Sequence, residues 1–426
     1  MRIKLAYGKT GMPLELDEAW NVTLVEPHYV AGLPDPVAAL GQALRAPIAS
    51  PPLCELVKPG DRVGVVFSDL TRPTPNRTML PVVLEALSML PKDRITLFNG
   101  VGTHRANTPA ELRTMLGDAA VDGYRIVQND AFDPATQLRL GVTRFGHEVW
   151  INRQLAECDV KILTGFIEPH LFAGFSGGGK AVMPGMAGLQ TVLGNHGAHM
   201  VGHPKAIWGI THGNPIWEEI QEAALLAHPS FLVDVTLNKD KQITGVFAGE
   251  MDAAHAAGCA FVKDTAMVPV TEAFDIVVTT NSGYPLDLNL YQGIKGVSAA
   301  AQVVRQGGAI ILAAECWDGI PDHGQYSQLL RAAASPRALL DMIFTPGFMQ
   351  HDQWEAQVQA QAQLKAEVYV RTDHLSPEQI RAALLEPCHR IEDTVAGLLK
   401  RYGAHARICV MPEGPQTIPY LTRPAQ

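Results

Sequence analysis

Short runs of β-branched and apolar residues alternate along this chain with stretches that repeat apolar positions at helical spacing. A predicted strand at 62–67 precedes a predicted helix over 75–90, and a strand at 95–98 precedes a helix that starts at Thr108. The second helix has threonine at its N-cap, proline at its first position and glutamate three residues after the cap, which is a capping box. This alternation predicts βα units and a largely parallel sheet.

Further strands are expected at 124–128, 149–152 and 159–163, with a hairpin of 231–237 and 243–247. The alternation then restarts, with strands at 275–280, 308–314, 367–370 and 406–410. We therefore predict an α/β fold of two α/β domains with largely parallel sheets, at 1–266 and 274–426. No glycine- or serine-rich linker separates the two domains, so we expect the active site in a cleft between them.

Composition narrows the class of protein. The chain has 426 residues, 47% hydrophobic and 18% charged, and a formal net charge of -9, which argues against a nucleic-acid surface. Its apolar runs are shorter than a membrane span of about 18 residues. The N-terminal residues do not resemble a signal peptide. Six scattered cysteines without a CxxC motif are typical of reduced thiols. We expect a cytoplasmic globular protein.

Polar residues follow several predicted strands. Asp69 and Arg72, His104, the segment 165–180 and the segment 281–284 all stand where a strand ends. Ligands of open α/β sheets bind at the carboxyl ends of strands, so we expect these residues to converge on one site. Arg72 could hold a carboxylate or phosphate, or simply pair with Asp69. His104 could be a general acid/base, or an ordinary loop histidine.

The segment 174–180 matches the start of a phosphate-binding loop, G-x-x-x-x-G-K, and ends at Lys180. Ala181 follows where that loop needs serine or threonine for magnesium, which argues against a P-loop phosphotransferase. The glycines could still approach a phosphate. Lys180 could act as a counter-charge or as a nucleophile that forms a covalent link.

Histidines and a second group of polar residues offer further chemistry. His196, His199 and His203 would share a helix face and could hold a transition metal, but glycines and a proline interrupt that stretch. His212 and His255 have no neighbouring motif that suggests a role. In the second domain, Gln292 and Lys295 stand three apart and would share a helix face. Trp354 opens a Gln- and Ala-rich helix and could equally be a core aromatic.

These motifs, in this order, resemble the nickel-pincer lactate racemase family over nearly the whole chain. The resemblance rests on residues 69–73, 100–105, 168–170, 175–180, 195–196, 283–287, 291–292, 295–296 and 352–354. One departure is Gln128-Asn129-Asp130, where many relatives have Asn-His-Asp. Trp317 and His323 lie in a loop, 316–324, that is expected to vary and to affect specificity.

The resemblance implies a cofactor, a pyridinium mononucleotide that holds nickel in a pincer. It implies that Lys180 forms a covalent thioamide link to this nucleotide and that His196 binds the nickel. It further implies cofactor contacts at Asp69, Gly177, Gly178 and Gly179. The implied partners are a small 2-hydroxy acid and the cofactor-synthesis proteins that make and load the pincer; a homodimer is one expected assembly.

The same resemblance implies that His104 and His170 are the acid/base pair. Arg72, Gln292, Lys295 and Trp354 would line the substrate pocket. The expected activity is a racemase or epimerase of lactate or a related acid such as malate. A hydride would move to the cofactor and back through a 2-keto acid. A non-catalytic carrier or sensor of the nucleotide remains the alternative, and the sequence does not choose the acid.

Overall fold

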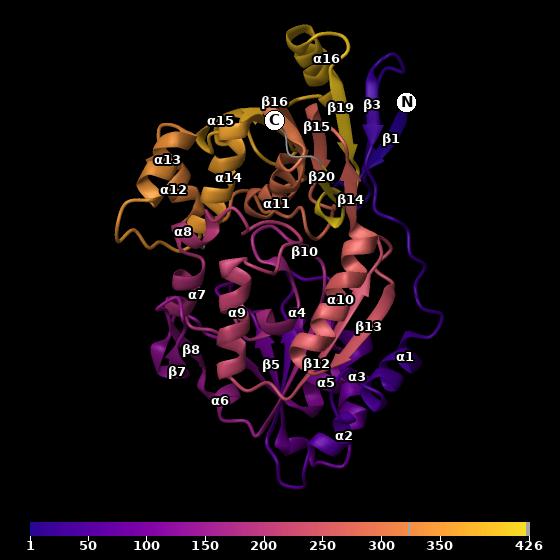
Figure 1. Ribbon diagram of the computed structural model, residues 1–426, viewed down its shortest axis with the longest axis vertical. Coiled ribbons are helices and arrows are strands. Elements are labelled where there is room, and N and C mark those ends of the chain that lie inside the picture. Colours follow the sequence, from indigo (N-terminus) through magenta and orange to yellow (C-terminus); the bar gives the residue numbers. More distant parts are fainter. Residues whose placement is uncertain (323, 423–426) are drawn as a thin grey trace. The chain divides into compact units, whose positions relative to one another are not determined.

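A computed structural model of the protein describes residues 1–322 and 324–422 (Figure 1). His323 of the expected variable loop lies outside the described residues. The chain divides into two compact units. The first unit comprises residues 29–196 and 203–264, and the second comprises 1–28, 197–202 and 265–426. The fold class expected from the sequence is confirmed, because both units are α/β and built on largely parallel sheets.

The predicted extent of the first domain, 1–266, differs from this division at its start. Residues 1–28 belong to the second unit, because β3 (Asn21–Leu24) pairs in parallel with β19 (Arg407–Met411). The hairpin of β1 (Arg2–Leu5) and β2 (Met12–Glu15) also contributes to the second unit's hydrophobic core. Pairing across almost the whole chain leaves no local signal in the sequence.

The first unit is built on a six-stranded sheet of order β13-β12-β9-β4-β5-β6. Its strands are β4 (Val63–Ser68), β5 (Ile95–Gly100), β6 (Arg125–Gln128), β9 (Val160–Phe166), β12 (Phe231–Leu237) and β13 (Ile243–Gly249). Strands β12, β9, β4, β5 and β6 run parallel to one another. Strand β13 pairs antiparallel with β12 and forms the predicted hairpin. The central strand β4 is buried along nearly its whole length, as a strand covered on both faces should be.

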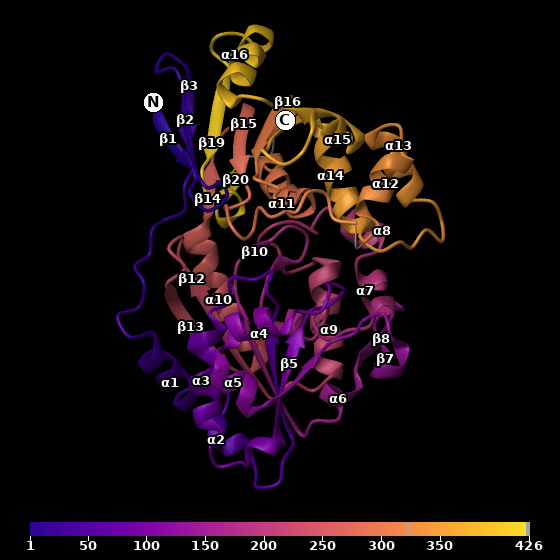
Figure 2. The ribbon, with the colours of Figure 1, turned by 180° about the vertical axis from the view of Figure 1, so that it is seen from behind.

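Helices α1 (Pro36–Arg45), α3 (Asn76–Ala86) and α4 (Pro109–Leu116) share one hydrophobic cluster with these strands (Figure 2). Thr108 caps α4, and both halves of the predicted capping box form. Helix α3 ends four residues before the predicted limit, because the Leu87 N–H bonds to the Leu84 carbonyl and leaves the α-helical pattern.

Further helices and strands complete the first unit. They are α2 (Leu53–Leu56), α5 (Asp118–Gly123), α6 (Arg153–Ala156), α7 (Leu189–Asn195), α9 (Pro215–Leu226), α10 (Met251–Ala266), β7 (Gln137–Val142), β8 (Glu148–Asn152), β10 (Pro169–His170) and β11 (Gly174–Phe175). The last two residues of α10 extend into the second unit.

The second unit is built on a parallel six-stranded sheet of order β18-β17-β16-β15-β19-β3. Its strands include β15 (Phe274–Thr280), β16 (Val304–Ala313), β17 (Ala366–Arg371) and β18 (Glu386–Pro387). Helices are α8 (Ala198–Val201), α11 (Leu290–Ala301), α12 (Tyr326–Ala332), α13 (Pro336–Ile343), α14 (Gln353–Lys365), α15 (Pro377–Ala382) and α16 (Ile391–Tyr402). A separate two-stranded sheet joins β14 (Met267–Val270) to β20 (Ile418–Leu421).

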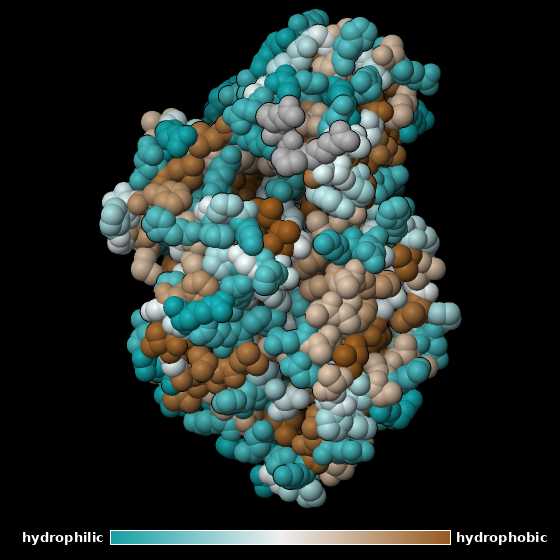
Figure 3. Space-filling view, in the orientation of Figure 1, coloured by the Kyte–Doolittle hydropathy of each residue, from teal (hydrophilic) through white to brown (hydrophobic). Residues whose placement is uncertain are grey.

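The molecular face in Figure 3 is a mosaic of hydrophilic and hydrophobic residues, which is ordinary for a folded protein surface. Within the described residues, no helix has both the length and the apolar character that crossing a bilayer requires.

Candidate active site

The strand order of the first unit places a topological switch point between β4 and β9. From β4 the chain continues to β5 and β6 on one side, whereas β9 and β12 lie on the other. Loops that leave the carboxyl ends of such strands diverge and open a crevice for ligands. Asp69 and Arg72 follow β4, His104 follows β5, and His170 follows β9. The first unit therefore brings these four predicted residues to one edge of its sheet.

Asp69 and His104 form a dyad. His104 Nδ1 lies 2.8 Å from Asp69 Oδ2, and Thr71 Oγ1 donates to Asp69 Oδ1 at 2.7 Å. Burial raises the pKa of Asp69, but the His104 charge and hydrogen bond outweigh it and leave that pKa below its ordinary value. An ionised carboxylate accepts from Nδ1–H, so the neutral ring keeps a lone pair on Nε2. The structure shows a contact of Asp69 with His104, and the predicted cofactor contact of Asp69 stays a prediction.

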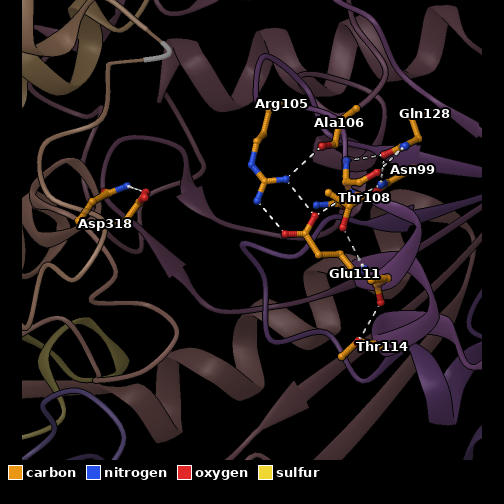
Figure 4. A network of polar contacts seen from close by, with 11 residues as sticks. Asn99, Arg105, Ala106, Thr108, Glu111, Thr114, Gln128 and Asp318 are labelled. Atoms are coloured by element: carbon orange, nitrogen blue, oxygen red, sulfur yellow. Dashed lines mark hydrogen bonds and ion pairs between the residues drawn. The ribbon is translucent and has the colours of Figure 1, made fainter.

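The loop that carries His104 is held at its base by a polar network (Figure 4). Asn99, at the end of β5, donates to both Asn107 and Gln128. Gln128 in turn accepts from the Asn107 N–H at 2.7 Å and donates to the Asn107 carbonyl at 2.9 Å. Arg105 binds Glu111 through two N–H groups. This network fixes the residues on both sides of His104 and gives Gln128 a structural role.

Asn129, which stands where many relatives have histidine, is buried and donates to the Ala187 carbonyl at 2.9 Å. Nearby, the Gly102 N–H donates to the Gly185 carbonyl at 2.9 Å. The loops after β5 and β6 are thus tied to the segment that follows Lys180.

The Arg72 side chain does not form the ion pair with Asp69 that the sequence left open as an alternative. Its Nη1 donates to Glu168 Oε1 at 2.7 Å, and both side chains are about three-quarters buried. This ion pair joins the loop after β4 to the loop after β9 across the switch point. A guanidinium has five N–H donors and the Glu168 contact uses one, so the arrangement still suits an anion. Glu168 lies in the motif at 168–170, but the sequence predicted no role for it.

His170, on β10, lies in an aromatic cluster. Its Nδ1 accepts from the Ala173 N–H at 3.3 Å, which places the proton of the neutral ring on Nε2. Phe172 contacts the rings of both His170 and His196 edge-on, each at 4.9 Å between centroids. Phe172 therefore packs against both histidine rings.

Lys180 lies in a short 3-10 turn, Gly178–Ala181, and its side chain is buried. No α-helix begins here, so the helix N-terminus that holds phosphate in a P-loop is missing at this place in the described chain. Packing and a positive φ together favour glycine at 177 and 178, whereas at 179 the nearest atom belongs to the flexible end of Gln221. A Cβ on Gly177 would lie 2.5 Å from Asp234, one on Gly178 2.7 Å from His255, and one on Gly179 2.6 Å from Gln221.

The Gly178 N–H also donates to Asp234, so it is not available to a phosphate. Cofactor contacts at Gly177, Gly178 and Gly179 therefore stay a prediction that would depend on other backbone groups.

His196 follows α7 directly and is buried. Burial lowers the pKa of His196 well below its ordinary value, and the charge of Lys180 lowers it further. The imidazole is thus neutral at physiological pH, the form that binds metals. Lys180 is close enough to His196 for its charge to act on the imidazole, as a lysine-linked metal group would need.

The alternative of a histidine trio is wrong. Helix α7 ends before His196, and His199 lies on a separate short helix, α8, in the second unit. Among residues 1–322 and 324–422, no three His, Cys, Asp or Glu side chains are grouped to hold a metal. A metal at His196 would need its remaining donors from a bound group.

Glu219 is a buried acid that the sequence analysis missed. It accepts from Asn195 Nδ2 at 3.0 Å, from Thr143 Oγ1 at 2.5 Å and from His147 Nδ1 at 2.9 Å. Asn195 precedes His196, so this cluster fixes the end of α7 where the predicted metal ligand stands. The sequence did carry a signal for Glu219. It stands three residues after Ile216 and four before Ala223, a spacing that places it on the apolar face of α9.

Replacing His147 with glutamine should flatten part of the pH dependence of stability. The hydrogen bond to Glu219 raises the pKa of His147 against the opposing effect of burial. A raised histidine pKa contributes stability that is present below the unfolded-state pKa and lost as pH rises through the folded-state value. Urea unfolding between about pH 6 and about pH 9 should show a wild-type loss of about 1 kcal/mol that H147Q lacks. His212→Gln, at an exposed position, should keep the wild-type slope.

The remaining predicted residues lie in the second unit. Gln292 and Lys295 are on α11, and Lys295 Nζ donates to Gln292 Oε1 at 2.5 Å, so the two do share a helix face. Trp354, on α14, donates through Nε1 to the Tyr291 hydroxyl at 2.9 Å and is buried. Beside them, burial raises the pKa of Glu355, the Lys295 charge lowers it, and the net shift is upward. Substrate contacts at these residues stay a prediction.

Comparisons with known proteins agree with this architecture. Residues 7–209 match the lactate racemase N-terminal domain, and residues 270–418 match the lactate racemase C-terminal domain. The lactate racemase of Lactiplantibacillus plantarum is 37% identical over 376 residues, 88% of each chain. The lactate racemase of Thermoanaerobacterium thermosaccharolyticum is 33% identical over 431 residues, 98% of each chain.

Solved structures give the same picture. The lactate racemase apoprotein from Thermoanaerobacterium thermosaccharolyticum superimposes with a TM-score of 0.91 at 30% identity, covering 98% of this chain and 100% of that one. A protein from Thermotoga maritima shares the fold, with a TM-score of 0.72 at 19% identity, covering 92% of this chain and 100% of its own.

Proposed function

This chain belongs to the lactate racemase family, and we therefore propose that it interconverts the enantiomers of a 2-hydroxy acid. Lactate is the first candidate substrate, and malate is a related one. The observation that carries the proposal is the set of groups in the first unit. An Asp69–His104 dyad and His170 follow neighbouring strands of one sheet, and a buried lysine interacts there with a neutral buried histidine.

Each of the two histidines is held through Nδ1, which supports a role for the Nε2 atoms in proton transfer. The neutral His104 ring has an acceptor at Nε2, because Nδ1 donates to Asp69. The neutral His170 ring has its proton on Nε2, because Nδ1 accepts from Ala173. A neutral imidazole takes the hydroxyl proton, and an imidazolium gives one back, because a neutral ring does not release its last N–H proton near neutral pH. The two rings would exchange these roles for the opposite enantiomer. A racemase needs such a group for each face of its substrate, since each enantiomer presents its hydroxyl differently.

The chemistry favours hydride removal over proton removal at the Cα atom. Taking a proton from Cα would leave a carbanion beside a carboxylate, whereas taking a hydride leaves a neutral 2-keto acid. The nickel-pincer pyridinium nucleotide implied by the family supplies a hydride acceptor when it is bound. His104 or His170 then takes the hydroxyl proton, and the other ring returns a proton after the keto acid has turned over.

The residues present fit that nucleotide. Lys180 would hold it through a thioamide link. His196 would bind the nickel, which imidazole nitrogen suits. Arg72 would hold the substrate carboxylate, and its pairing with Glu168 would fix the guanidinium until substrate arrives. Gln292, Lys295 and Trp354 would complete the substrate contacts. The protein contributes orientation and electrostatics, and the nucleotide contributes the redox step.

Racemisation in D₂O tests this route. Protein is produced together with the cofactor-synthesis proteins, and each enantiomer of lactate and of malate is followed by chiral chromatography and proton NMR. We expect interconversion in which the Cα hydrogen is retained, because a transferred hydride does not exchange with solvent.

Wash-in of deuterium at Cα during racemisation would contradict hydride transfer while leaving a racemase. Protein that carries the Lys180 adduct and nickel but converts no 2-hydroxy acid would instead indicate the carrier or sensor.

A further inference from the structure

Asp234 is a carboxyl group buried inside the first unit, directly behind the glycine loop. It lies on β12 and is 0% exposed. Its Oδ2 accepts from the Gly178 N–H at 2.7 Å. A Cβ on Gly165 would lie 2.7 Å from Oδ1, and one on Gly177 would lie 2.5 Å from Oδ2. The carboxyl group therefore fits between β9 and the loop only because both neighbours are glycine.

This carboxyl group is costly for the fold. Burial raises the pKa of Asp234 to about 7, although the Gly178 N–H opposes that shift. Among the described residues, Oδ1 has no hydrogen-bond partner. Buried charges that lack full compensation destabilise proteins, and apolar residues of similar volume often do better. An acid in a largely apolar strand therefore needs a reason beyond packing.

A second buried group holds the same loop from behind. His255, on α10, lies 2.8 Å through Nε2 from the Ser176 carbonyl and is stacked on Trp217 at 4.8 Å between centroids. Cys259 lies 3.3 Å from His255 Nδ1, so the ring can donate at Nε2 and accept at Nδ1. Burial lowers the pKa of His255 to about 4, which keeps it neutral. Residues 176 and 178 are thus held by two side chains from distant elements.

We propose that Asp234 is a positioning residue for Lys180, acting through the Gly178 N–H. Gly178 is the first residue of the turn that contains Lys180, and the Lys180 N–H closes that turn on the Gly177 carbonyl at 3.1 Å. Fixing Gly178 therefore fixes the direction in which the Lys180 side chain leaves the loop. The inference rests on the proposed function only in taking Lys180 as the covalent tether.

The test compares Asp234→Val with Thr236→Val. Valine resembles aspartate in shape, suits a strand and cannot accept a hydrogen bond. Thr236 is on the same strand and face, is buried, and bonds to Thr244 instead of the loop, so T236V is a matched control. The Lys180 amine of the cofactor-free protein is acylated, and its labelling rate is measured by peptide mass spectrometry against Lys161. Intact mass then reports the Lys180 adduct after co-expression with the cofactor-synthesis proteins.

We expect D234V to label Lys180 about tenfold faster than wild type, because the Gly178 N–H loses its buried acceptor and the loop opens more often. Its adduct yield should fall, whereas T236V should match the wild type in both readouts. Asp234→Asn keeps an acceptor for Gly178 and should restore the wild-type labelling rate. Where D234V yields too little folded protein, Asp234→Ser, with a hydroxyl too short to reach Gly178, replaces it.

Equal labelling of Lys180 in wild type, D234V and T236V would overturn the proposal, as would D234N behaving like D234V. The outcome is separable from that of the proposed function. Faster labelling in D234V, in a protein whose wild type never racemises a hydroxy acid, supports the positioning role and removes the racemase. Unchanged labelling of Lys180 in D234V, in a protein whose wild type does racemise a hydroxy acid, removes the positioning role and supports the racemase.

Discussion

Lys180→Arg is expected to abolish both cofactor attachment and racemisation. Arginine keeps the positive charge of Lys180 near His196 but cannot form a thioamide link. Because the redox step belongs to the nucleotide, turnover should fall to the uncatalysed rate, a loss of at least about 10⁶-fold by the usual range of enzymatic accelerations. Intact-protein mass spectrometry should show an unmodified chain, and metal analysis should show no bound nickel.

A matched control is Lys161→Arg. Lys161 is another buried lysine of the first unit, and its ammonium donates to the Cys158 carbonyl. K161R should retain the adduct and the activity, which would show that loss in K180R is not a general effect of enlarging a buried lysine. Adduct mass and turnover surviving in K180R would remove Lys180 as the tether.

His104→Gln and His170→Gln are expected to lower kcat about 10²–10⁴-fold each, the usual contribution of a positioned acid or base. The two variants should also differ in the enantiomer that they oxidise faster, which a loss of stability alone would not produce. Each variant retains one base, so each should still form the keto acid rapidly from one enantiomer and slowly from the other. The favoured enantiomer should be opposite in the two variants.

Rapid quenching after mixing with a single enantiomer, followed by assay of the keto acid, measures this preference. His212→Gln, a substitution of an exposed histidine in the same unit, should leave both enantiomers unaffected. The same preference in both histidine variants would contradict the assignment of one ring to each substrate face.

Local sequence patterns predicted most secondary structure because the relevant forces act over a few residues. The capping box at Thr108 forms as expected, since cap and glutamate are three residues apart. Strand β4 and strand β5 start within one residue of prediction, because short runs rich in β-branched and apolar residues can be recognised without their partner strands. The first 28 residues were misplaced because their strand pairs with a segment almost 400 residues away.

The glycine loop shows where local reading fails. From the sequence, residues 174–180 resemble a phosphate loop, and the glycines suggest room for a ligand. In the structure, Gly177 and Gly178 face Asp234 and His255, and this packing together with a positive φ favours glycine. The clue in the sequence was one acid inside the largely apolar strand β12, which a strand prediction does not explain.

The sequence by itself determined the α/β class, the strand ends from which the functional loops leave, and the family, through motifs that are each only a few residues long. Tertiary structure alone decided which side chains meet: Asp69 with His104, Arg72 with Glu168, and Gly178 with Asp234. The partners are 35, 96 and 56 residues apart. The physical reason is that hydrophobic periodicity depends only on which face of a helix or strand is buried. Which residues pack against that face depends on the order of the strands in the sheet.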